Sequence, residues 1–444
     1  MKDSLTRLGV AAQYSFDRPQ PEPQVKVLNT FKGIKHVFDQ PAQFSVIYDL
    51  KGSQTDYGNM LGFDDPAKHD PDRSLALHAL FPTRNSLDEY RKYYREGIKK
   101  RIAEKSYTFP DVPGRYVDIV TDVVNNMSLH WAADCLCGVD MKTKDNPRGM
   151  YTEQEVWEMF ELLNALLGIV STVHSTVESV IDHKPCADFM KRLASTSRPI
   201  NELISIIIGL AVGSSVDYAQ AAVQVIDFYL DDERAQERAK IVELAKAPLD
   251  DTASMELLRS YTREGMRLSP QVPGLWREAL TDASIHQGDD LPNLEVKRGD
   301  RLYASFANAH LNPTDFPDPT KVDPTRPESS YCYNGTGFHK CPGVTYSEQT
   351  ITEILKVVFS LKNVRRAPGN DGKLLGFKKI VNETPIPVYL TPYVSTTGKA
   401  KPSTSLTSMM NEREAFGLPN LNAGIFVAQT VSRRDYKEWL YSLM

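Results

Sequence analysis

The residues best able to do chemistry lie in a glycine-rich stretch at 334–343, which reads NGTGFHKCPG. Cys341 stands just before an expected helix, where the free amides and the dipole of a helix N-terminus favour a thiolate over a thiol. Gly337 and Gly343 would let the backbone turn tightly around the sulfur. Taken alone, the stretch fits a buried cysteine in a turn as well as it fits a thiolate that binds a metal.

A thiolate in such a loop can serve as the axial ligand of a haem iron, where it promotes cleavage of O–O bonds. His339 stands close enough to Cys341 in the chain to reach a haem propionate. The remaining histidines, His69 among them, are expected at the surface or in the core. The other cysteines form no paired framework and lack the spacing of a zinc site, so we expect mostly reduced core thiols. They are Cys135, Cys137, Cys186 and Cys332.

A second set of charged residues precedes the cysteine. Glu264 and Arg267 stand one helical turn apart and are followed by a Leu-x-Pro sequence, and proline-rich sequence then leads on to Arg326. In their order and spacing, residues 264–343 resemble the cytochrome P450 superfamily. A second Glu-x-x-Arg match begins at Glu256, but it lacks the Leu-x-Pro sequel, so we choose the pair at Glu264.

That resemblance implies a mainly α fold with a small β region, the cytochrome P450 fold, and a haem b whose iron is bound by Cys341. It also implies that Glu264, Arg267 and Arg326 join to lock the segment before the cysteine loop. Arg277 stands where the resemblance expects a partner for a haem propionate. The implied cofactor-binding residues are Cys341, His339, Arg277, Gly337 and Gly343.

Two departures from the superfamily pattern are informative. Asn334 stands where the superfamily usually has a phenylalanine, seven residues before the cysteine, so the loop must pack differently against a haem. The expected buried helix lacks the usual acid–alcohol pair, since residues 211–220 read AVGSSVDYAQ. Without that pair, dioxygen activation has no positioned acid catalyst, whereas a substrate that brings its own O–O bond needs none.

A narrower resemblance rests on the GFHKC loop and on residues 219–230. Over most of residues 25–390, the chain looks like the P450-type domain of fungal linoleate diol synthases and psi-factor-producing oxygenases. In those fusions, a dioxygenase half accompanies a P450-type domain that rearranges fatty-acid hydroperoxides. The sequence contains no such dioxygenase half, so we expect a small apolar substrate that an upstream dioxygenase supplies as a hydroperoxide.

In that family, an Asn-Gln-x-Gln element on the buried helix assists hydroperoxide cleavage. Here Asp217 and Tyr218 stand at the first two positions, and Gln220 is retained. An amide both donates and accepts hydrogen bonds, whereas an ionised carboxylate only accepts them. A protonated carboxyl group can donate one. Asp217 and Gln220 are therefore the candidate catalytic residues. A structural interpretation, in which Asp217 caps a kink or bonds to Ser214, is equally open.

Hydrophobic periodicity and capping signals predict a helical middle followed by short strands. Residues 202–230 are apolar nearly throughout, with serines and Asp217 near the centre, which favours a buried core helix over a membrane span. After Pro270, alternating residues and glycines indicate strands and turns. The predicted elements are helices at 86–105, 117–137, 152–169 (opened by a capping box), 202–230 and 348–361, a strand at 301–305 and a hairpin at 374–390.

Composition sets the outer limits of the prediction. The 444 residues are 41% hydrophobic and 25% charged with a net charge of -5, so we expect a large folded core and no nucleic-acid partner. Residues 1–24 carry charges and prolines without an apolar signal core, which predicts a cytoplasmic protein with no membrane span. We divide the chain into a haem-thiolate domain, 1–394, and a C-terminal extension of unknown role, 395–444.

Three functions are compatible with these features. The leading hypothesis is a haem-thiolate enzyme that cleaves or isomerises a hydroperoxide without a reductase. The second is a monooxygenase of fungal secondary metabolism that takes electrons from a separate reductase. The third is a non-catalytic protein that binds haem or a partner, against which the retained Cys341, Glu264, Arg267 and Arg326 argue.

Overall fold

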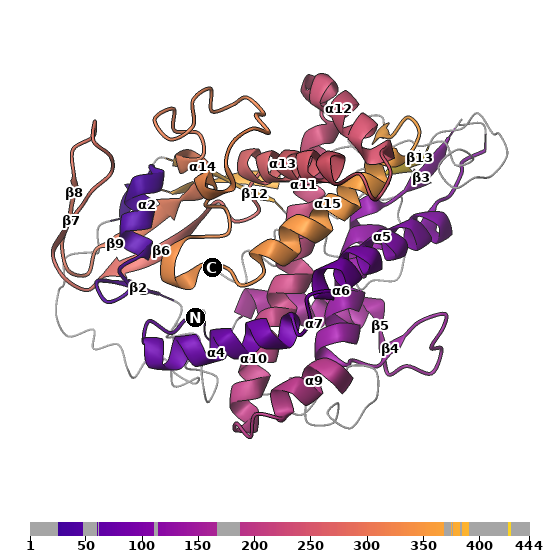
Figure 1. Ribbon diagram of the computed structural model, residues 1–444, viewed down its shortest axis with the longest axis horizontal. Helices are drawn as coiled ribbons and strands as arrows, with labels where there is room; N and C mark the ends of the chain where they lie inside the picture. The colour runs from indigo at the N-terminus through magenta and orange to yellow at the C-terminus, as the bar shows by residue number, and fades with distance from the viewer. Residues whose placement is uncertain are drawn as a thin grey trace, which may run out of the picture.

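The computed structural model describes residues 25–47, 60, 62–110, 114–166, 187–367, 374, 376–381, 384–389 and 425–427. Figure 1 shows a large group of helices on one side and a smaller group of strands next to α2 (Phe31–Phe38) on the other. The prediction of a mainly α fold with a small β region is confirmed.

The helices run through most of the described chain. The further α-helices are α4 (Pro66–Leu80), α5 (Ser86–Lys105), α6 (Asn126–Trp131), α7 (Glu153–Leu166), α9 (Ala187–Ala194), α10 (Ile200–Val212), α11 (Tyr218–Leu230), α12 (Ala235–Lys246), α13 (Thr252–Leu268), α14 (Phe306–Ala309) and α15 (Val344–Ser360). The π-helical stretches are η2 (Ile119–Asn125), η3 (Ala132–Cys137) and η5 (Gly213–Asp217), and the 3-10 turns are η6 (Asp232–Arg234), η7 (Glu328–Ser330) and η8 (Gly337–His339).

The largest sheet combines strands from the N-terminal part of the chain with strands that follow α13. Its order is β1-β9-β6-β2, with β1 parallel to β9 and the other neighbours antiparallel. Its strands are β1 (Val25–Leu28), β9 (Arg301–Ser305), β6 (Gly274–Ala279) and β2 (Phe44–Val46). The smaller pairings join β4 (Met141–Lys142) to β5 (Tyr151–Thr152), β7 (Ala283–Ile285) to β8 (Leu294–Val296), and β11 (Gly376–Val381) to β12 (Thr384–Tyr389).

A short piece of the predicted C-terminal extension joins the body of the protein. Strand β13 (Ile425–Val427) lies parallel to and between β3 (Arg115–Val117) and β10 (Arg365–Arg366). The rest of 395–444 lies outside the described residues, so the division of the chain at 394 stays a prediction. The same holds for Cys186 and for the end of the helix predicted to reach 169.

The long apolar helix predicted at 202–230 is present as α10, η5 and α11, which run without a break from Ile200 to Leu230. By length and composition it could cross a membrane, with a mean hydropathy of 1.5 in its most apolar window, but 61% of that window is buried inside the protein. This burial supports the core-helix interpretation, while the cytoplasmic location stays a prediction. The π-helical turn at its centre was not predicted.

Helix α5 and the hairpin β11–β12 lie where the sequence predicts them. The capping box is also confirmed, because Thr152 Oγ1 accepts from the Glu155 amide at 3.2 Å and Glu155 Oε2 accepts from the Thr152 amide at 2.8 Å. The single helix predicted at 117–137 is wrong in detail. Asp118 caps a helix that starts at Ile119 by accepting from two backbone amides, and the helix contains two π-helical stretches.

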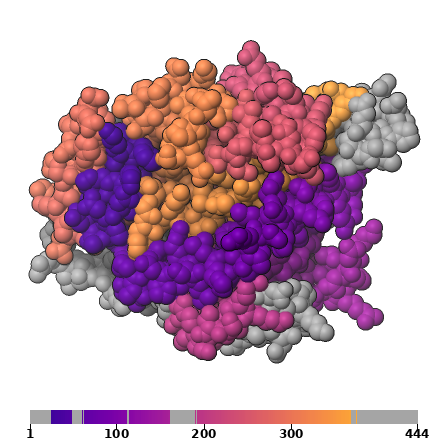
Figure 2. All heavy atoms as spheres, in the orientation of Figure 1, coloured from indigo at the N-terminus to yellow at the C-terminus, as the bar shows by residue number. Residues whose placement is uncertain are grey.

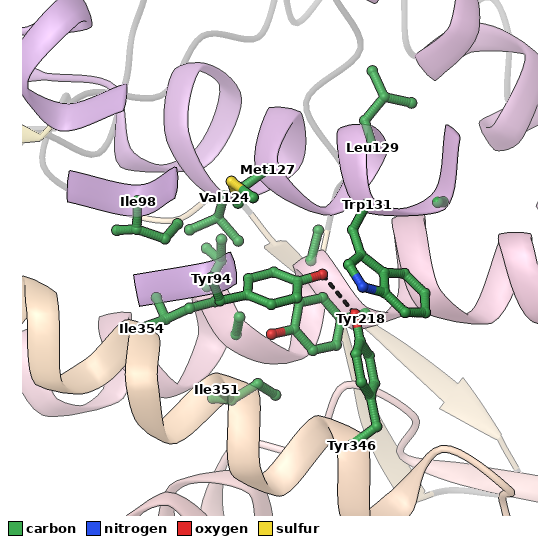
Figure 3. Packing of buried hydrophobic residues seen from close by; sticks show 14 of the residues in the cluster. Tyr94, Ile98, Val124, Met127, Leu129, Trp131, Tyr218, Tyr346, Ile351 and Ile354 are labelled. Carbon is green, nitrogen blue, oxygen red and sulfur yellow. Dashed lines mark hydrogen bonds between the residues drawn. The ribbon is translucent and has the colours of Figure 1, made fainter. Parts of the chain in front are cut away.

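The core is centred on α15, which packs against α5, α12 and α13. Figure 2 shows the purple surface of the N-terminal helices meeting the orange surface of the later chain. In Figure 3, Tyr94, Tyr218 and Tyr346 converge beside Trp131, and Tyr94 and Tyr346 share a hydrogen bond of 2.7 Å between their hydroxyls. Tyr218 therefore belongs to the core, where its hydroxyl donates to Thr350 Oγ1 at 2.8 Å.

Candidate haem-thiolate site

The cysteine loop is held by its own backbone. The Cys341 amide donates to the Asn334 carbonyl at 3.0 Å, and the Gly343 amide donates to Cys341 Sγ at 3.4 Å. Gly337 has a φ of +66°, and a Cβ there would collide with Asp39 and the carbonyl of Phe38. Only glycine fits at this position, for both its conformation and its close approach to a neighbouring segment.

The pKa of the Cys341 thiol lies above its ordinary value. Burial is the main cause, while the Gly343 amide and the Arg73 guanidinium act in the opposite direction. The negative charge of Asp217 raises the pKa further. The Gly343 amide thus favours the thiolate as expected, but desolvation of the buried sulfur outweighs it. A metal cation at the sulfur would reverse this balance.

Helix α4 brings His69 and Arg73 to the cysteine loop. The His69 ring lies 4.0 Å from the ring of Phe338 and 5.1 Å from that of His339, measured between centroids. His69 Nδ1 lies 2.8 Å from Asp70 Oδ1, and the charge on Arg73 acts on Cys341. The two residues stand four apart, so they share one face of the helix.

The hydrogen bonding of three buried nitrogens beside this loop indicates whether the residues fit a haem. His69 Nε2, Arg73 Nη1 and His339 Nδ1 are buried and have no hydrogen-bond partner among the described residues. Buried polar nitrogens are rarely left in this state, and each needs an explanation. The two carboxylates of a haem held by Cys341 would supply the missing acceptors, so the residues fit the group.

Sequence reasoning missed the role of His69 and did not consider Arg73. The available signal was a histidine and an arginine at i and i+4, directly after the Asp65 cap and the proline that open α4. Nothing in the sequence places this helix against a loop that follows more than half of the chain later. The interpretation of His69 as a core residue is right as to its burial, since the residue is 1% exposed.

Arg277 and His339 lie near each other, as the resemblance implied. Arg277 on β6 is buried, lies 4.0 Å over the ring of Phe38, and donates to the Trp276 carbonyl. Its positive charge contributes to lowering the pKa of His339, although burial of the imidazole is the larger cause. His339 Nε2 lies 3.0 Å from Asp64 Oδ1. Their contacts with haem propionates stay predictions.

The structure brings Glu264, Arg267 and Arg326 together. Arg267 forms a two-pronged pair with Glu264, at 2.8 and 2.7 Å, and both side chains are fully buried. Arg326 Nε lies 3.7 Å from Glu264 Oε1. Arg267 also donates to the carbonyls of His310, Pro319 and Lys321.

Two further contacts attach this cluster to the chain before Cys341. Glu264 accepts from the Asp323 amide at 2.8 Å and from the Tyr331 hydroxyl at 3.0 Å. The cluster thereby ties α13 to the segment that leads into the cysteine loop.

The long helix has a face that is more accessible than the rest of its surface. In a helix that is otherwise mostly buried, Gly213, Asp217 and Gln220 are accessible, and a Cβ on Gly213 would meet nothing within 4 Å. They are spaced four and three residues apart, so they share one face. The charge of Asp217 acts on Cys341, so this face lies within electrostatic reach of the sulfur.

Several polar groups on or beside this face form hydrogen bonds within the protein. Ser215 Oγ donates to the Ala211 carbonyl at 2.6 Å, and Ser214 Oγ donates to the same carbonyl at 3.3 Å. Gln271, in the segment between α13 and β6, donates from Nε2 to Asp217 Oδ1 at 3.1 Å and to Gln220 Oε1 at 3.3 Å. Gln271 carries no sequence signal, because its partners are more than fifty residues away.

Comparisons with known proteins agree with this geometry. A family model described as cytochrome P450 matches residues 229–384. Psi-producing oxygenase A of Aspergillus fumigatus is 26% identical over 437 residues, covering 88% of this chain and 39% of that protein. A bifunctional dioxygenase–epoxy alcohol synthase of Fusarium oxysporum is 28% identical over 436 residues, covering 88% of this chain and 33% of that protein. The chain thus spans well under half of the length of these relatives.

Among solved structures, cytochrome P450 CYP109B1 of Bacillus subtilis matches with a TM-score of 0.61 and 18% identity, covering 83% of this chain and 93% of that one. At this identity the likeness shows the fold. Fold, family model and relatives agree with the cysteine loop and the buried Glu264–Arg267 pair: the chain has the cytochrome P450 fold and is similar to the haem-thiolate enzymes of the cytochrome P450 superfamily.

Proposed function

We propose that the chain binds haem b through Cys341 and rearranges fatty-acid hydroperoxides without an external reductase. The observation that carries the proposal is the helix face across from Cys341. It presents a carboxylate and an amide, Asp217 and Gln220, while both neighbouring serine hydroxyls donate to the Ala211 carbonyl. This face suits the handling of a bound peroxide better than the delivery of protons to dioxygen.

The residues that would hold the haem surround the cysteine loop. Cys341 Sγ would bind the iron, and the nitrogens of His69, Arg73 and His339 that lack partners among the described residues would bind the propionates, with Arg277 near His339. When bound, the haem supplies an iron whose thiolate ligand promotes O–O cleavage. Glu264 and its partners keep the loop in place.

On the opposite side, the chain's own groups orient the substrate. The Gln220 amide can donate to one oxygen of a hydroperoxide and accept from its hydroxyl group, while Asp217 can take up or hold that proton. Gly213 leaves room for an alkyl chain, since a side chain there would meet open space. A hydroperoxide and its epoxy alcohol or diol are isomers, so the overall conversion needs no electron donor.

The names of the relatives support this substrate class. An epoxy alcohol synthase activity is named for one bifunctional relative, and the other is named a psi-producing oxygenase. Both are covered by this chain over only a part of their length. We propose that a dioxygenase supplies the hydroperoxide.

An anaerobic assay tests the proposal. Purified, haem-loaded protein is mixed with a panel of fatty-acid hydroperoxides, and the products are identified by mass spectrometry. Isomers of the substrate are expected, with no dependence on NADPH or a reductase. Turnover that requires dioxygen and a reductase would instead establish a monooxygenase, and haem binding without either reaction would favour the non-catalytic alternative.

A further inference from the structure

Gln271 connects the long helix to a segment that is far from it in the sequence. Asp217 and Gln220 lie one turn apart on the long helix, and Gln271 lies in the segment after α13. One nitrogen, Gln271 Nε2, lies 3.1 Å from Asp217 Oδ1 and 3.3 Å from Gln220 Oε1. A side-chain amide nitrogen carries two hydrogens, so it can donate to both oxygens at once.

These two hydrogen bonds fix the orientation of the Asp217 and Gln220 side chains. The bond to Asp217 involves a carboxylate and is of the stronger, charge-assisted kind when that group is ionised. Because the oxygen of Gln220 faces Gln271, its amide nitrogen must point the other way. The bond thus sets which end of the Gln220 amide faces Gln271, and a peroxide oxygen would take the nitrogen end as its donor.

The segment that carries Gln271 is anchored firmly. Gln271 follows Arg267 by four residues, and Arg267 is fully buried in its pair with Glu264. Between them, the Ser269 amide donates to the Gly265 carbonyl at 2.9 Å, and Ser269 and Pro270 are buried. A bridging side chain that leaves a rigid anchor can impose its geometry on the residues that it contacts.

We propose that Gln271 is a positioning residue for this site, and that the group acting on the hydroperoxide is a three-residue unit formed with Asp217 and Gln220. The inference rests on the proposed function and deepens it, since it assigns the orientation of the Gln220 amide to a residue outside the helix. Gln271 acts through its neighbours and determines which oxygen of the peroxide meets a donor.

The test is the isosteric substitution Gln271→Met, which keeps the length of the side chain and removes both hydrogen bonds. Gln287→Met is the matched control, because Gln287 bonds to the Pro292 carbonyl in the turn between β7 and β8. With hydroperoxide, kcat of Gln271→Met is expected to fall roughly tenfold, which corresponds to about 1.4 kcal/mol, while KM changes less than twofold. The ratio of isomeric products is expected to shift, and Gln287→Met to behave like the parent protein.

A double-mutant cycle separates positioning from general loosening of the segment. If Gln271 acts through Gln220, adding Gln220→Met to Gln271→Met causes little further loss, so the two effects are not additive. Independent losses that multiply, or an unchanged rate and product ratio in Gln271→Met, would overturn the proposal. Haem content and thermal unfolding of each variant show that the fold is retained.

A second readout does not depend on turnover. The Soret band of the resting ferric protein reports the spin state of the haem, which responds to polar groups that face it. Gln271→Met and Gln220→Met are expected to shift this band in the same direction, and Gln287→Met to leave it unchanged. If the parent protein consumes no hydroperoxide but this coupling is found, the proposed function fails and the bridge stands. If the parent protein is active but neither readout shows coupling, the bridge alone fails.

Discussion

The Cys341 thiol loses more from burial than it gains from the Gly343 amide and the charge of Arg73, so its pKa lies above the ordinary value. A free thiol of this kind is a poor nucleophile at neutral pH, because the thiolate is the reactive form. Iron changes the balance, since its positive charge stabilises the thiolate directly. The residue is therefore suited to a ligand role and unsuited to nucleophilic catalysis on its own.

The first prediction at the scale of single residues concerns the sulfur atom of Cys341. Cys341→Ser removes the thiolate, and hydroperoxide turnover is expected to fall by at least two orders of magnitude because cleavage of the O–O bond depends on that ligand. Electron paramagnetic resonance of the ferric protein should lose the signature of a sulfur ligand. Cys135→Ser, at a partly buried cysteine of η3, is the control and should retain both properties. A fully active Cys341→Ser variant would refute the ligand assignment.

The unpartnered Arg73 leads to a second prediction. Arg73→Leu removes a half-buried cation whose buried Nη1 has no partner among the described residues, so haem-free protein should remain folded. Haem should bind about tenfold more weakly, because a hydrogen bond to a charged group contributes roughly 1.5 kcal/mol. Transfer of haem to an excess of apomyoglobin measures this loss. Arg84→Leu, at an exposed position after α4, should change nothing.

Only some of these residues could be found from the sequence. Cys341, Glu264 and Arg267 stand in short motifs with fixed spacing, so local order identifies them. His69 and Gln271 owe their places to contacts with segments far along the chain, which no local pattern encodes. Predicting them requires the packing of α4 and of the segment after α13, and therefore the tertiary structure.

At the scale of elements, the long helix is shaped by its π-helical turn. A π-helical turn inserts an extra residue and changes which side chains face a given direction, and such turns are frequent at functional sites. In η5, Ser215 and Val216 are buried, whereas Gly213 and Asp217 are accessible. Periodicity predicted a helix over this range but not the turn, because a single inserted residue hardly alters an apolar pattern.

Two helical glycines provide the prediction at this scale. A Cβ at Gly213 meets nothing within 4 Å, so Gly213→Ala should raise the free energy of unfolding by about 0.5–1 kcal/mol. A Cβ at Gly265 in α13 would lie 2.8 Å from Val225 Cγ1 and 3.0 Å from Tyr229 Cε2. Gly265→Ala should therefore lower the free energy of unfolding by about 1–3 kcal/mol. Denaturant unfolding of both variants measures the contrast. Destabilisation by Gly213→Ala would show that other atoms pack against Gly213 and leave no room for a methyl group.

At the scale of the whole molecule, the buried Glu264–Arg267 pair ties helices to the irregular chain before the cysteine loop. Its contacts reach His310, Pro319, Asp323 and Tyr331. The mainly α fold could be predicted from periodicity, and the hairpin at 374–390 from its turn. The parallel pairing of β1 with β9 could not, because nothing local links two strands so far apart in the sequence.

The pair provides the last prediction. Glu264→Gln leaves the buried Arg267 charge without its carboxylate, and the free energy of unfolding should fall by about 3–5 kcal/mol. Glu256→Gln is the matched control, since Glu256 is 54% exposed in its pairs with Arg259 and Arg263 and should contribute no more than about 1 kcal/mol. Urea denaturation compares the two. Equal losses would mean that burial of the first pair has no special effect.

The pairing of β1 with β9 also governs the order in which the protein assembles. Val25 must meet Arg301, so nearly three hundred residues have to leave the ribosome before this edge of the sheet can close. Bringing such distant segments together is entropically costly and slows folding. His69 and Cys341 are separated in the same way. The residues proposed to hold the haem can therefore meet only after the segment that contains Cys341 has been synthesised.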